Sequence, residues 1–345
     1  MITEEVPYPN PTPFAMRDPR RATWPAVLVA ICLAARTAHA GNGAGEWLDS
    51  IRPSAELQEF LDRAIDGLLA KDARLRDAKV RVALLDLSHG DPPALAHQHG
   101  DVPIYPASVV KFVYLMAAYR WQEQDRLRIE GDIDRDLSEM IRQSSNQATR
   151  KVFARLTDTE PGPELPPDTY RDFRERRLAV ERWLVSLGIR DLHCVNPTYD
   201  GNGDLFGRDA QFIRDASVPG GLGGSPPNRQ AMTANGTAKL LALLATDRAL
   251  SPADSAVVRQ RMRRDPKEQR HLAARIAGGA TRVSGLEVYA KSGTWGPIYA
   301  DAGIVRHVES GRQMVIVVFT EANPAYRGEF IADLTERSAR RLLVR

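Results

Sequence analysis

The chain has 345 residues, of which 43% are hydrophobic and 26% are charged, and its formal net charge is +3. This length allows one or two domains with a full core, and the composition is ordinary for a folded globular protein. So balanced a charge argues against nucleic acid or an anionic membrane surface as the partner.

Residues 1–40 are typical of an export signal. Three arginines within 17–21 precede an apolar run, 25–35, and the segment ends in the small-x-small pattern of a cleavage site. We therefore expect a periplasmic or secreted protein whose mature chain has no membrane span. The apolar run is short for a helix that crosses a bilayer, although a membrane anchor stays open as the alternative. Translation could begin at Met1 or at Met16, because the residues before Met16 are polar and rich in proline.

Hydrophobic periodicity predicts strands near both ends of the mature chain and helices between them. The expected strands are 80–87, 94–100, 286–291, 300–306 and 314–320, and the expected helices are 54–69, 109–118, 233–244 and one from 329. This order predicts an α+β fold, in which an inserted all-α domain interrupts one antiparallel sheet. The assigned parts are the signal peptide, 1–40, the α/β part of the catalytic domain, 41–107 and 280–345, and its inserted helical part, 108–279.

One segment of the middle has almost no periodicity. Residues 196–229 are dense in Gly, Pro, Asn and Asp, and a stretch of this length inside a domain is commonly functional or disordered. A second segment, 158–172, is acidic and rich in proline.

Metal or cofactor chemistry has little support in the sequence. His97 and His99 could share one face of a strand, but no further ligands are evident, and there is no Gly-rich phosphate loop. Signal cleavage would remove Cys32 and leave Cys194, which we expect to be a buried structural thiol. We therefore assign no metal and no cofactor.

The first chemical motif is Ser108-Val109-Val110-Lys111, at the start of the most apolar helix. A lysine in a buried helix needs a partner or a use, because a buried charge is costly. Residues three apart share a helix face, so the Ser108 hydroxyl and the Lys111 amine can meet. Burial lowers a lysine pKa, and a neutral amine can take the serine proton. The pattern predicts Ser108 as a nucleophile activated by Lys111; the alternative is a capping serine beside a lysine that reaches solvent.

The second motif is Ser144-Ser145-Asn146, which precedes a predicted helix. We expect the Ser144 hydroxyl to relay protons among the nucleophile, the lysine and the leaving group. Asn146 is expected to hydrogen-bond a substrate amide and Lys111. The alternative is an ordinary helix cap.

The third motif, Lys291-Ser292-Gly293-Thr294, ends a predicted strand. Gly293 lets a substrate backbone approach the strand edge. We expect Lys291 to lower the proton affinity of the second motif's first serine, and Ser292 or Thr294 to bind a substrate carboxylate. The backbone N–H groups of Thr294 and Ser108 could form an oxyanion hole. The alternative is an exposed strand end that leads into a turn.

In this order the three motifs resemble the signature of class A β-lactamases and penicillin-binding proteins, S-x-x-K, S-x-N and K-[ST]-G. The likeness covers roughly residues 50–345, including Ile104-Tyr105-Pro106-Ala107 before the serine and Asp301-Ala302-Gly303-Ile304 after the third motif. It implies a β-lactamase/DD-peptidase-like fold with a five-stranded antiparallel sheet flanked by helices. It also implies an acyl-enzyme on Ser108, a small-molecule β-lactam or peptidoglycan-like substrate, no cofactor and a monomer.

The sequence departs from the class A pattern at two places. The family's Glu-x-x-x-Asn element, whose glutamate activates the deacylating water, has no glutamate here. Asp200 lies near the expected place and Asp204 is a second candidate, although both could be turn residues of an Asp- and Gly-rich loop. The arginine that many class A enzymes carry after the third motif is missing, with Ala302 near its position. A substrate carboxylate would then depend on Ser292, Thr294 or an arginine elsewhere.

Three functions remain open on these grounds. The chain could be a class A-like β-lactamase with a role in antibiotic resistance. It could be a peptidoglycan peptidase, an amidase or an esterase on the same scaffold. It could also be a penicillin or peptidoglycan sensor that acylates slowly or not at all. The residues for acylation are present, whereas fast deacylation needs a water base, for which Asp200 is the first candidate.

Overall fold

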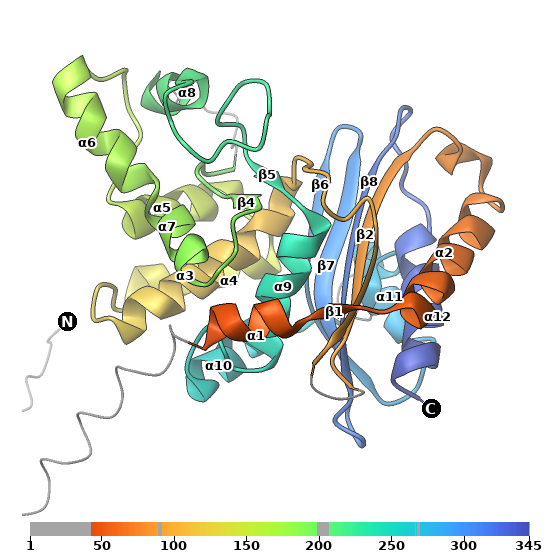
Figure 1. Ribbon diagram of the computed structural model, residues 1–345. Helices are drawn as coiled ribbons and strands as arrows, with labels where there is room; N and C mark the ends of the chain where they lie inside the picture. Colours follow the sequence, from red (N-terminus) through yellow and green to blue (C-terminus); the bar gives the residue numbers. More distant parts are fainter. Residues whose placement is uncertain (1–42, 89–91, 199–206, 266, 268–269, 345) are drawn as a thin grey trace, which may run out of the picture. The chain divides into compact units, whose positions relative to one another are not determined.

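The chain forms a six-stranded β-sheet with helices on both faces, next to a largely helical region (Figure 1). The computed structural model describes residues 43–88, 92–198, 207–265, 267 and 270–344. The described α-helices are α1 (Ala44–Ser50), α2 (Ala55–Leu69), α3 (Lys111–Glu123), α4 (Gly131–Arg142), α5 (Asn146–Thr157), α6 (Pro167–Arg177), α7 (Ala179–Ser186), α8 (Gly207–Arg214), α9 (Ala234–Ala245), α10 (Pro252–Met262), α11 (Ile276–Ala280) and α12 (Phe330–Leu342). The strands are β1 (Arg52–Pro53), β2 (Lys79–Asp86), β3 (Ala94–Gln98), β4 (Leu192–His193), β5 (Ala231–Met232), β6 (Leu286–Trp295), β7 (Ile298–His307) and β8 (Gln313–Glu321). None of these helices has the length and apolarity needed to cross a membrane.

The main sheet has the strand order β1-β3-β2-β8-β7-β6. All neighbouring strands are antiparallel except β1, which runs parallel to β3. The predicted α+β class and the antiparallel five-stranded core are confirmed, but the count of five is wrong by the short edge strand β1. The sequence did not predict β1 because the strand contains Pro53. A proline argues against a strand in general, although it is tolerated at a sheet edge.

The two faces of the sheet pack against different helices because alternate residues of a strand point to opposite sides. On β2, Val82 and Leu84 belong to one buried cluster with residues of α2 and α12. Ala83 and Leu85 belong to the other cluster, with residues of α3 and α9. Strand β2 therefore lies between two apolar layers and reads as a nearly continuous apolar run.

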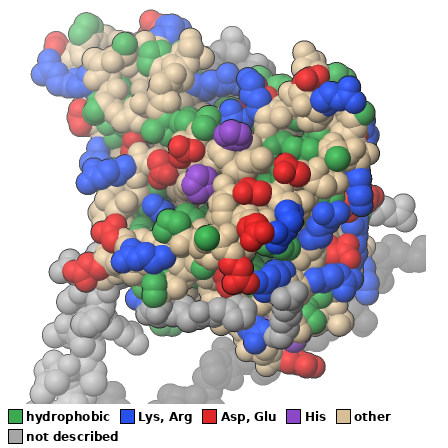
Figure 2. Space-filling model, turned by 45° about the vertical axis from the view of Figure 1, so that its right-hand side comes forward, with side chains coloured by type: hydrophobic (Ala, Val, Ile, Leu, Met, Phe, Trp, Pro, Cys, Tyr) green, Lys and Arg blue, Asp and Glu red, His purple; other side chains and the backbone are tan. Residues whose placement is uncertain are grey.

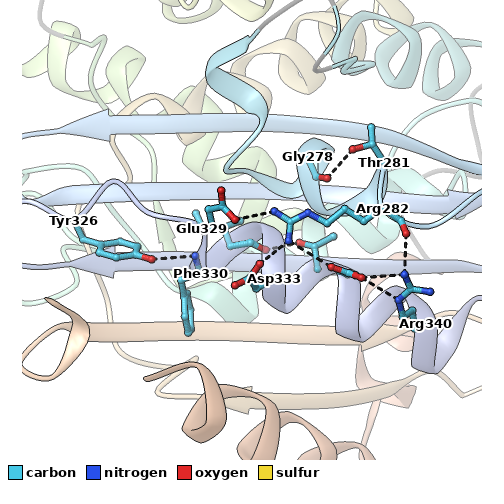
Figure 3. A network of polar contacts seen from close by, with 11 residues as sticks. Gly278, Thr281, Arg282, Tyr326, Glu329, Phe330, Asp333 and Arg340 are labelled. Carbon is cyan, nitrogen blue, oxygen red and sulfur yellow. Dashed lines mark hydrogen bonds and ion pairs between the residues drawn. The ribbon is translucent and has the colours of Figure 1, made fainter. Parts of the chain in front are cut away.

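Ion pairs tie helix α12 to the segment that follows α11 (Figure 3). Arg282 of that segment contacts the carboxylates of Glu329 and Asp333, at 3.0 and 2.5 Å. Arg340 contacts the Glu336 carboxylate at 3.0 Å and the Arg282 carbonyl at 2.9 Å. Exposed pairs contribute at most about 1 kcal/mol each, but together they fix how α12 lies along the sheet. Basic and acidic side chains also lie mixed over the face in Figure 2.

Helix α3 is the centre of the helical region. Its residues from Phe112 to Tyr119 are all buried, as expected for a helix that is apolar on every side. The helix begins at Lys111 rather than at residue 109, because residues 107–110 form a tighter 3₁₀ turn, η2 (Ala107–Val110). This turn places the first motif next to β6, which is the last strand in the order of the sheet.

The segment 196–229 and the acidic segment 158–172 both contain helix. Helix α6 begins inside 158–172 with Pro167 at its first position, and α8 lies inside 196–229. Their helices are short and weakly patterned, and tertiary contacts hold them: Arg177 of α6 and Asp209 of α8 form an ion pair with both side chains 2% exposed. Pairing across so long a loop is invisible to local periodicity.

Candidate active site

Ser108 lies in the 3₁₀ turn η2, one turn before Lys111. The backbone N–H of Lys111 donates to the Ser108 carbonyl, and this spacing eclipses the two side chains on one side of the turn. Lys111 is fully buried, whereas Ser108 is half-buried. The lysine therefore does not reach solvent, whereas the alternative interpretation requires that it does. Ala107, directly before the serine, has a φ of +48°, a left-handed conformation typical of constrained functional turns.

Ser144 occupies the turn between α4 and α5 with a φ of +57°. The adjacent Ser145, and not Ser144, caps α5, because its hydroxyl accepts from the Ala148 N–H at 3.1 Å. The helix-cap interpretation thus applies to Ser145 alone. The Ser144 hydroxyl is directed to other partners by a backbone conformation that a non-glycine residue rarely adopts.

Lys111 and Lys291 meet at Ser144. The Nζ atom of Lys111 lies 2.5 Å from the Ser144 carbonyl oxygen, 3.3 Å from the Ser144 hydroxyl and 2.7 Å from Asn146 Oδ1. The Nζ atom of Lys291 donates to the same hydroxyl at 2.9 Å and to the Ser292 carbonyl at 2.8 Å. The structure thus brings side chains from all three motifs together.

The environment holds both lysines toward the neutral form. Burial lowers the pKa of Lys111 to about 7. Burial, followed by the positive charges of Lys111 and Arg264, lowers the pKa of Lys291 well below its usual value. A neutral Lys111 has two N–H groups, which match its two short contacts, to the Ser144 carbonyl and to Asn146. Its lone pair is then available to accept a proton.

Strand β6 packs against the 3₁₀ turn at Gly293. A Cβ atom at Gly293 would lie 2.8 Å from the Pro106 carbonyl oxygen and 3.1 Å from the Ser108 nitrogen, so only glycine permits this approach. Ser292 is half-buried and Thr294 is exposed next to it. Because β6 is the outermost strand, its other side is an edge along which an extended substrate can lie.

Arg275, which precedes α11, supports the third motif from behind and was not singled out from the sequence. Its guanidinium donates to the Thr294 hydroxyl at 2.6 Å, to the Gly293 carbonyl at 3.2 Å and to the Ala300 carbonyl. Its Cζ atom lies 3.5 Å from the centroid of the Tyr299 ring. Because the Thr294 hydroxyl accepts from Arg275, its own proton is free to point toward a substrate anion. Arg275 is therefore an arginine outside the family position, and it can act on a substrate anion through the Thr294 hydroxyl.

Ala302, near the position of the missing family arginine, pairs with Lys291 in the sheet register. Its side chain is buried in the apolar cluster on the α3 and α9 side of the sheet. A long basic side chain there would enter the core.

Asp301 is the carboxylate that the buried cations share. It is 1% exposed, and one of its oxygens accepts from the Ile276 N–H at 3.1 Å. Burial raises the pKa of Asp301, and the positive charges of Arg275, Arg264 and Lys291 oppose that rise. Arg275 and Arg264 are themselves buried, so two guanidinium charges act on this one carboxylate. Their positive charge also lowers the pKa of Lys291 and favours anionic substrates.

The predicted water base falls in a gap, because Asp200 and Asp204 lie outside the described residues. The loop that leads to them is firmly anchored at Asn196, whose carbonyl accepts from the Tyr114 hydroxyl at 2.5 Å. The Asn196 amide in turn donates to the Asn228 carbonyl at 2.6 Å.

The remaining predictions concern metals and the thiol. Cys194 is free and buried, as predicted. In the part of the chain that the structure describes, no group of His, Cys, Asp and Glu side chains is arranged to hold a metal ion.

Comparison with known proteins gives a family match over part of the chain and a fold. Residues 176–342 match the family described as the β-lactamase enzyme family. No curated protein sequence matches the chain. Among solved structures, a β-lactamase from Sphaerobacter thermophilus DSM 20745 is similar with a TM-score of 0.58 and 19% identity, over 83% of this chain and 98% of that one.

Two further structures show the breadth of the fold. PBP-A is similar with a TM-score of 0.57 and 16% identity, over 85% of this chain and 97% of that one. The TLA-1 extended-spectrum β-lactamase is similar with a TM-score of 0.58 and 15% identity, over 84% of this chain and 99% of that one. Identities this low establish the fold alone. The match over residues 176–342 and these structures agree in pointing to β-lactamases and PBP-A as the proteins that this chain is similar to.

Proposed function

We propose that the chain is a serine hydrolase that forms an acyl-enzyme on Ser108 and hydrolyses β-lactams. One observation carries the proposal: Lys111 and Lys291 both contact the Ser144 hydroxyl, and Lys111 lies one 3₁₀ turn from Ser108. This arrangement contains a nucleophile, a buried amine to deprotonate it and a hydroxyl to pass the proton on.

Acylation follows from these positions. The Ser108 oxygen attacks the lactam carbonyl carbon while its proton passes to the neutral Lys111 amine. The carbonyl π electrons move to oxygen, and two backbone N–H groups, of Ser108 and Thr294, stabilise that oxyanion. When the carbonyl re-forms, the C–N bond breaks. The Ser144 hydroxyl gives its proton to the leaving nitrogen and regains one from Lys111.

Lys291 supports proton transfer by Ser144 through a hydrogen bond. Its donation to Ser144 occupies one lone pair of that hydroxyl and leaves the hydroxyl proton free for the leaving group. The buried cations behind β6 attract the substrate carboxylate, for which Ser292 and Thr294 supply hydroxyl groups. Asn146 orients Lys111 and offers its amide N–H₂ group to the substrate.

Deacylation requires water and a base, and we assign Asp200 to that role on its place in the sequence. A peptidoglycan peptidase, an amidase, an esterase or a penicillin sensor would use the same acylation residues. It would differ in the fate of the acyl-enzyme. The likeness of the fold to both β-lactamases and PBP-A is compatible with each of these outcomes.

We further infer that residues 1–40 direct export, so that the enzyme acts in the periplasm or outside the cell. We also infer that it acts as a monomer. The test uses the mature chain with a chromogenic cephalosporin and intact-mass detection. Turnover supports the β-lactamase, and a trapped adduct on Ser108 without turnover supports a peptidase or a sensor. Absence of any adduct, or an undiminished rate in Ser108→Ala, would refute acylation at this residue.

A further inference from the structure

Arg229 lies on two aromatic rings beside the candidate nucleophile. Its Cζ atom is 4.6 Å from the centroid of the Tyr105 ring and 5.1 Å from that of Trp295. The two rings meet edge to face, with centroids 5.2 Å apart. A guanidinium over two ring faces keeps its N–H edges available to other partners.

The three side chains come from the elements that frame the site. Tyr105 directly precedes the turn that carries Ser108, and Trp295 ends strand β6 just after the third motif. These two elements touch, as the close approach of Gly293 to the Pro106 carbonyl shows. Trp295 is 50% exposed, which places the cluster at the rim of the site rather than in the core.

The backbone at Arg229 is fixed on both sides. The Asn228 side chain is fully buried and donates to the Phe212 and Asp215 carbonyls, at 2.7 and 2.6 Å. The Gln230 side chain is 4% exposed and donates to the Asn196 carbonyl. Arg229 is therefore presented from an anchored segment, which reduces the entropy lost when its side chain orders around a ligand.

Within the described part of the chain, the positive charge of Arg229 is not paired with a carboxylate. Among the described residues, no carboxylate forms an ion pair with Arg229 and none accepts a hydrogen bond from its guanidinium. Arg214, at the end of α8, does pair with a carboxylate, that of Glu164, at 2.7 Å. A cation that is stacked on two rings beside the site, with no ion pair to a described residue, is suited to bind a carboxylate through two N–H groups.

We propose that Arg229, which lies on the Tyr105 and Trp295 rings, binds an anionic group of the substrate. This group lies on the substrate's side chain, away from the bond that reacts with Ser108. The inference rests on the proposed acylation of Ser108 and specifies its substrates: donors with a carboxylate on the side chain react faster than their neutral analogues. This carboxylate is distinct from the one that the cations behind β6 attract. Arg229, at the end of the segment 196–229, thus acts as a specificity residue.

Two penicillins that differ by one carboxylate test this assignment. Carbenicillin is benzylpenicillin with a carboxylate on the side-chain α-carbon. The measurement is the ratio of their second-order rate constants for acylation, in the parent and in Arg229→Gln. A charge-assisted contact corresponds to about tenfold, so the ratio should fall about tenfold in Arg229→Gln and recover in Arg229→Lys.

A matched control separates the site from stacking in general. Arg248 also lies over a ring, 4.9 Å from the Trp47 centroid, and Arg248→Gln should leave the ratio at the parent value. Added salt should lower the parent ratio, because it screens an exposed ion pair. An unchanged ratio in Arg229→Gln overturns the assignment and leaves the hydrolase proposal standing.

A binding measurement keeps the two proposals apart. In the Ser108→Ala background, which cannot acylate, calorimetry compares the dissociation constants of the two penicillins. Tighter binding of carbenicillin that Arg229→Gln abolishes supports the anion site even where the parent shows no acylation. Equal binding of both penicillins, or binding of neither, overturns it.

Discussion

Lys111 and Lys291 converge on one hydroxyl group, that of Ser144, at 3.3 and 2.9 Å. Two ammonium groups at such a distance from one atom would repel each other, and both lysines are buried. The site therefore favours at least one neutral amine. The chemistry of the molecule follows from which of the two gives up its proton and at what pH.

Replacement of Ser144 should affect chemistry, whereas replacement of its neighbour should affect folding. Ser144→Ala removes the shared hydroxyl and should slow acylation by about a hundredfold or more, the range of a lost proton relay. The rate constant for acylation by a penicillin measures this.

Ser145→Ala is the matched control for that experiment. It removes the cap of α5 and should lower the free energy of unfolding by about 1 kcal/mol. Equal loss of acylation in both variants would show that the turn as a whole, and not the Ser144 hydroxyl, is required.

The rate of acylation should depend on the protonation of Lys111. Since burial lowers the pKa of Lys111 to about 7, its amine is neutral above that pH and charged below it. The acylation rate should therefore rise with pH through about 7 and then level off. Lys111→Arg should abolish the reaction, because a guanidinium stays protonated. A flat profile between about pH 5 and 9 would exclude Lys111 as the base.

Gly293→Ala should obstruct the site itself. The added methyl would lie 2.8 Å from the Pro106 carbonyl oxygen, a backbone atom that cannot rotate away. Strand β6 and the turn of Ser108 must separate, so we expect acylation to fall by about a hundredfold, the loss that small misplacements of reacting groups cause.

Gly45→Ala is the control for an added methyl group. Gly45 lies in α1 with nothing near its Cβ position, and alanine there should raise the free energy of unfolding by about 0.5–1 kcal/mol. An active Gly293→Ala variant would contradict the close approach of strand and turn.

The buried ion pair between Arg177 and Asp209 should be important for stability. Asp209→Asn leaves the Arg177 charge buried and unpaired, and should lower the free energy of unfolding by about 3–5 kcal/mol. Urea denaturation followed by circular dichroism measures the change. The control is Glu164→Gln, whose exposed pair with Arg214 is worth at most about 1 kcal/mol. Similar effects of the two substitutions would mean that α6 and α8 are held by apolar contacts instead.

Much of the architecture was accessible from sequence because it depends on local patterns. The alternation in β2, β7 and β8 and the unbroken apolarity of α3 predicted buried strands and a buried helix, and the structure confirms them. The edge strand β1 and the short helices α6 and α8 were missed. Their residues have weak local signals, and the main sheet or a distant ion pair holds them in place.

The amino-acid sequence by itself determined that Ser108 and Lys111 share one side of a turn, because three residues of spacing settle that locally. Only the tertiary structure brought the Ser144 hydroxyl, expected from its motif to relay protons, against both lysines. It also decided that Arg275 supports Thr294 and that one carboxylate, Asp301, serves several cations. The contacts that settle these points join residues 33 and 147 positions apart. Such contacts depend on how helices pack on a sheet, and no local spacing encodes that.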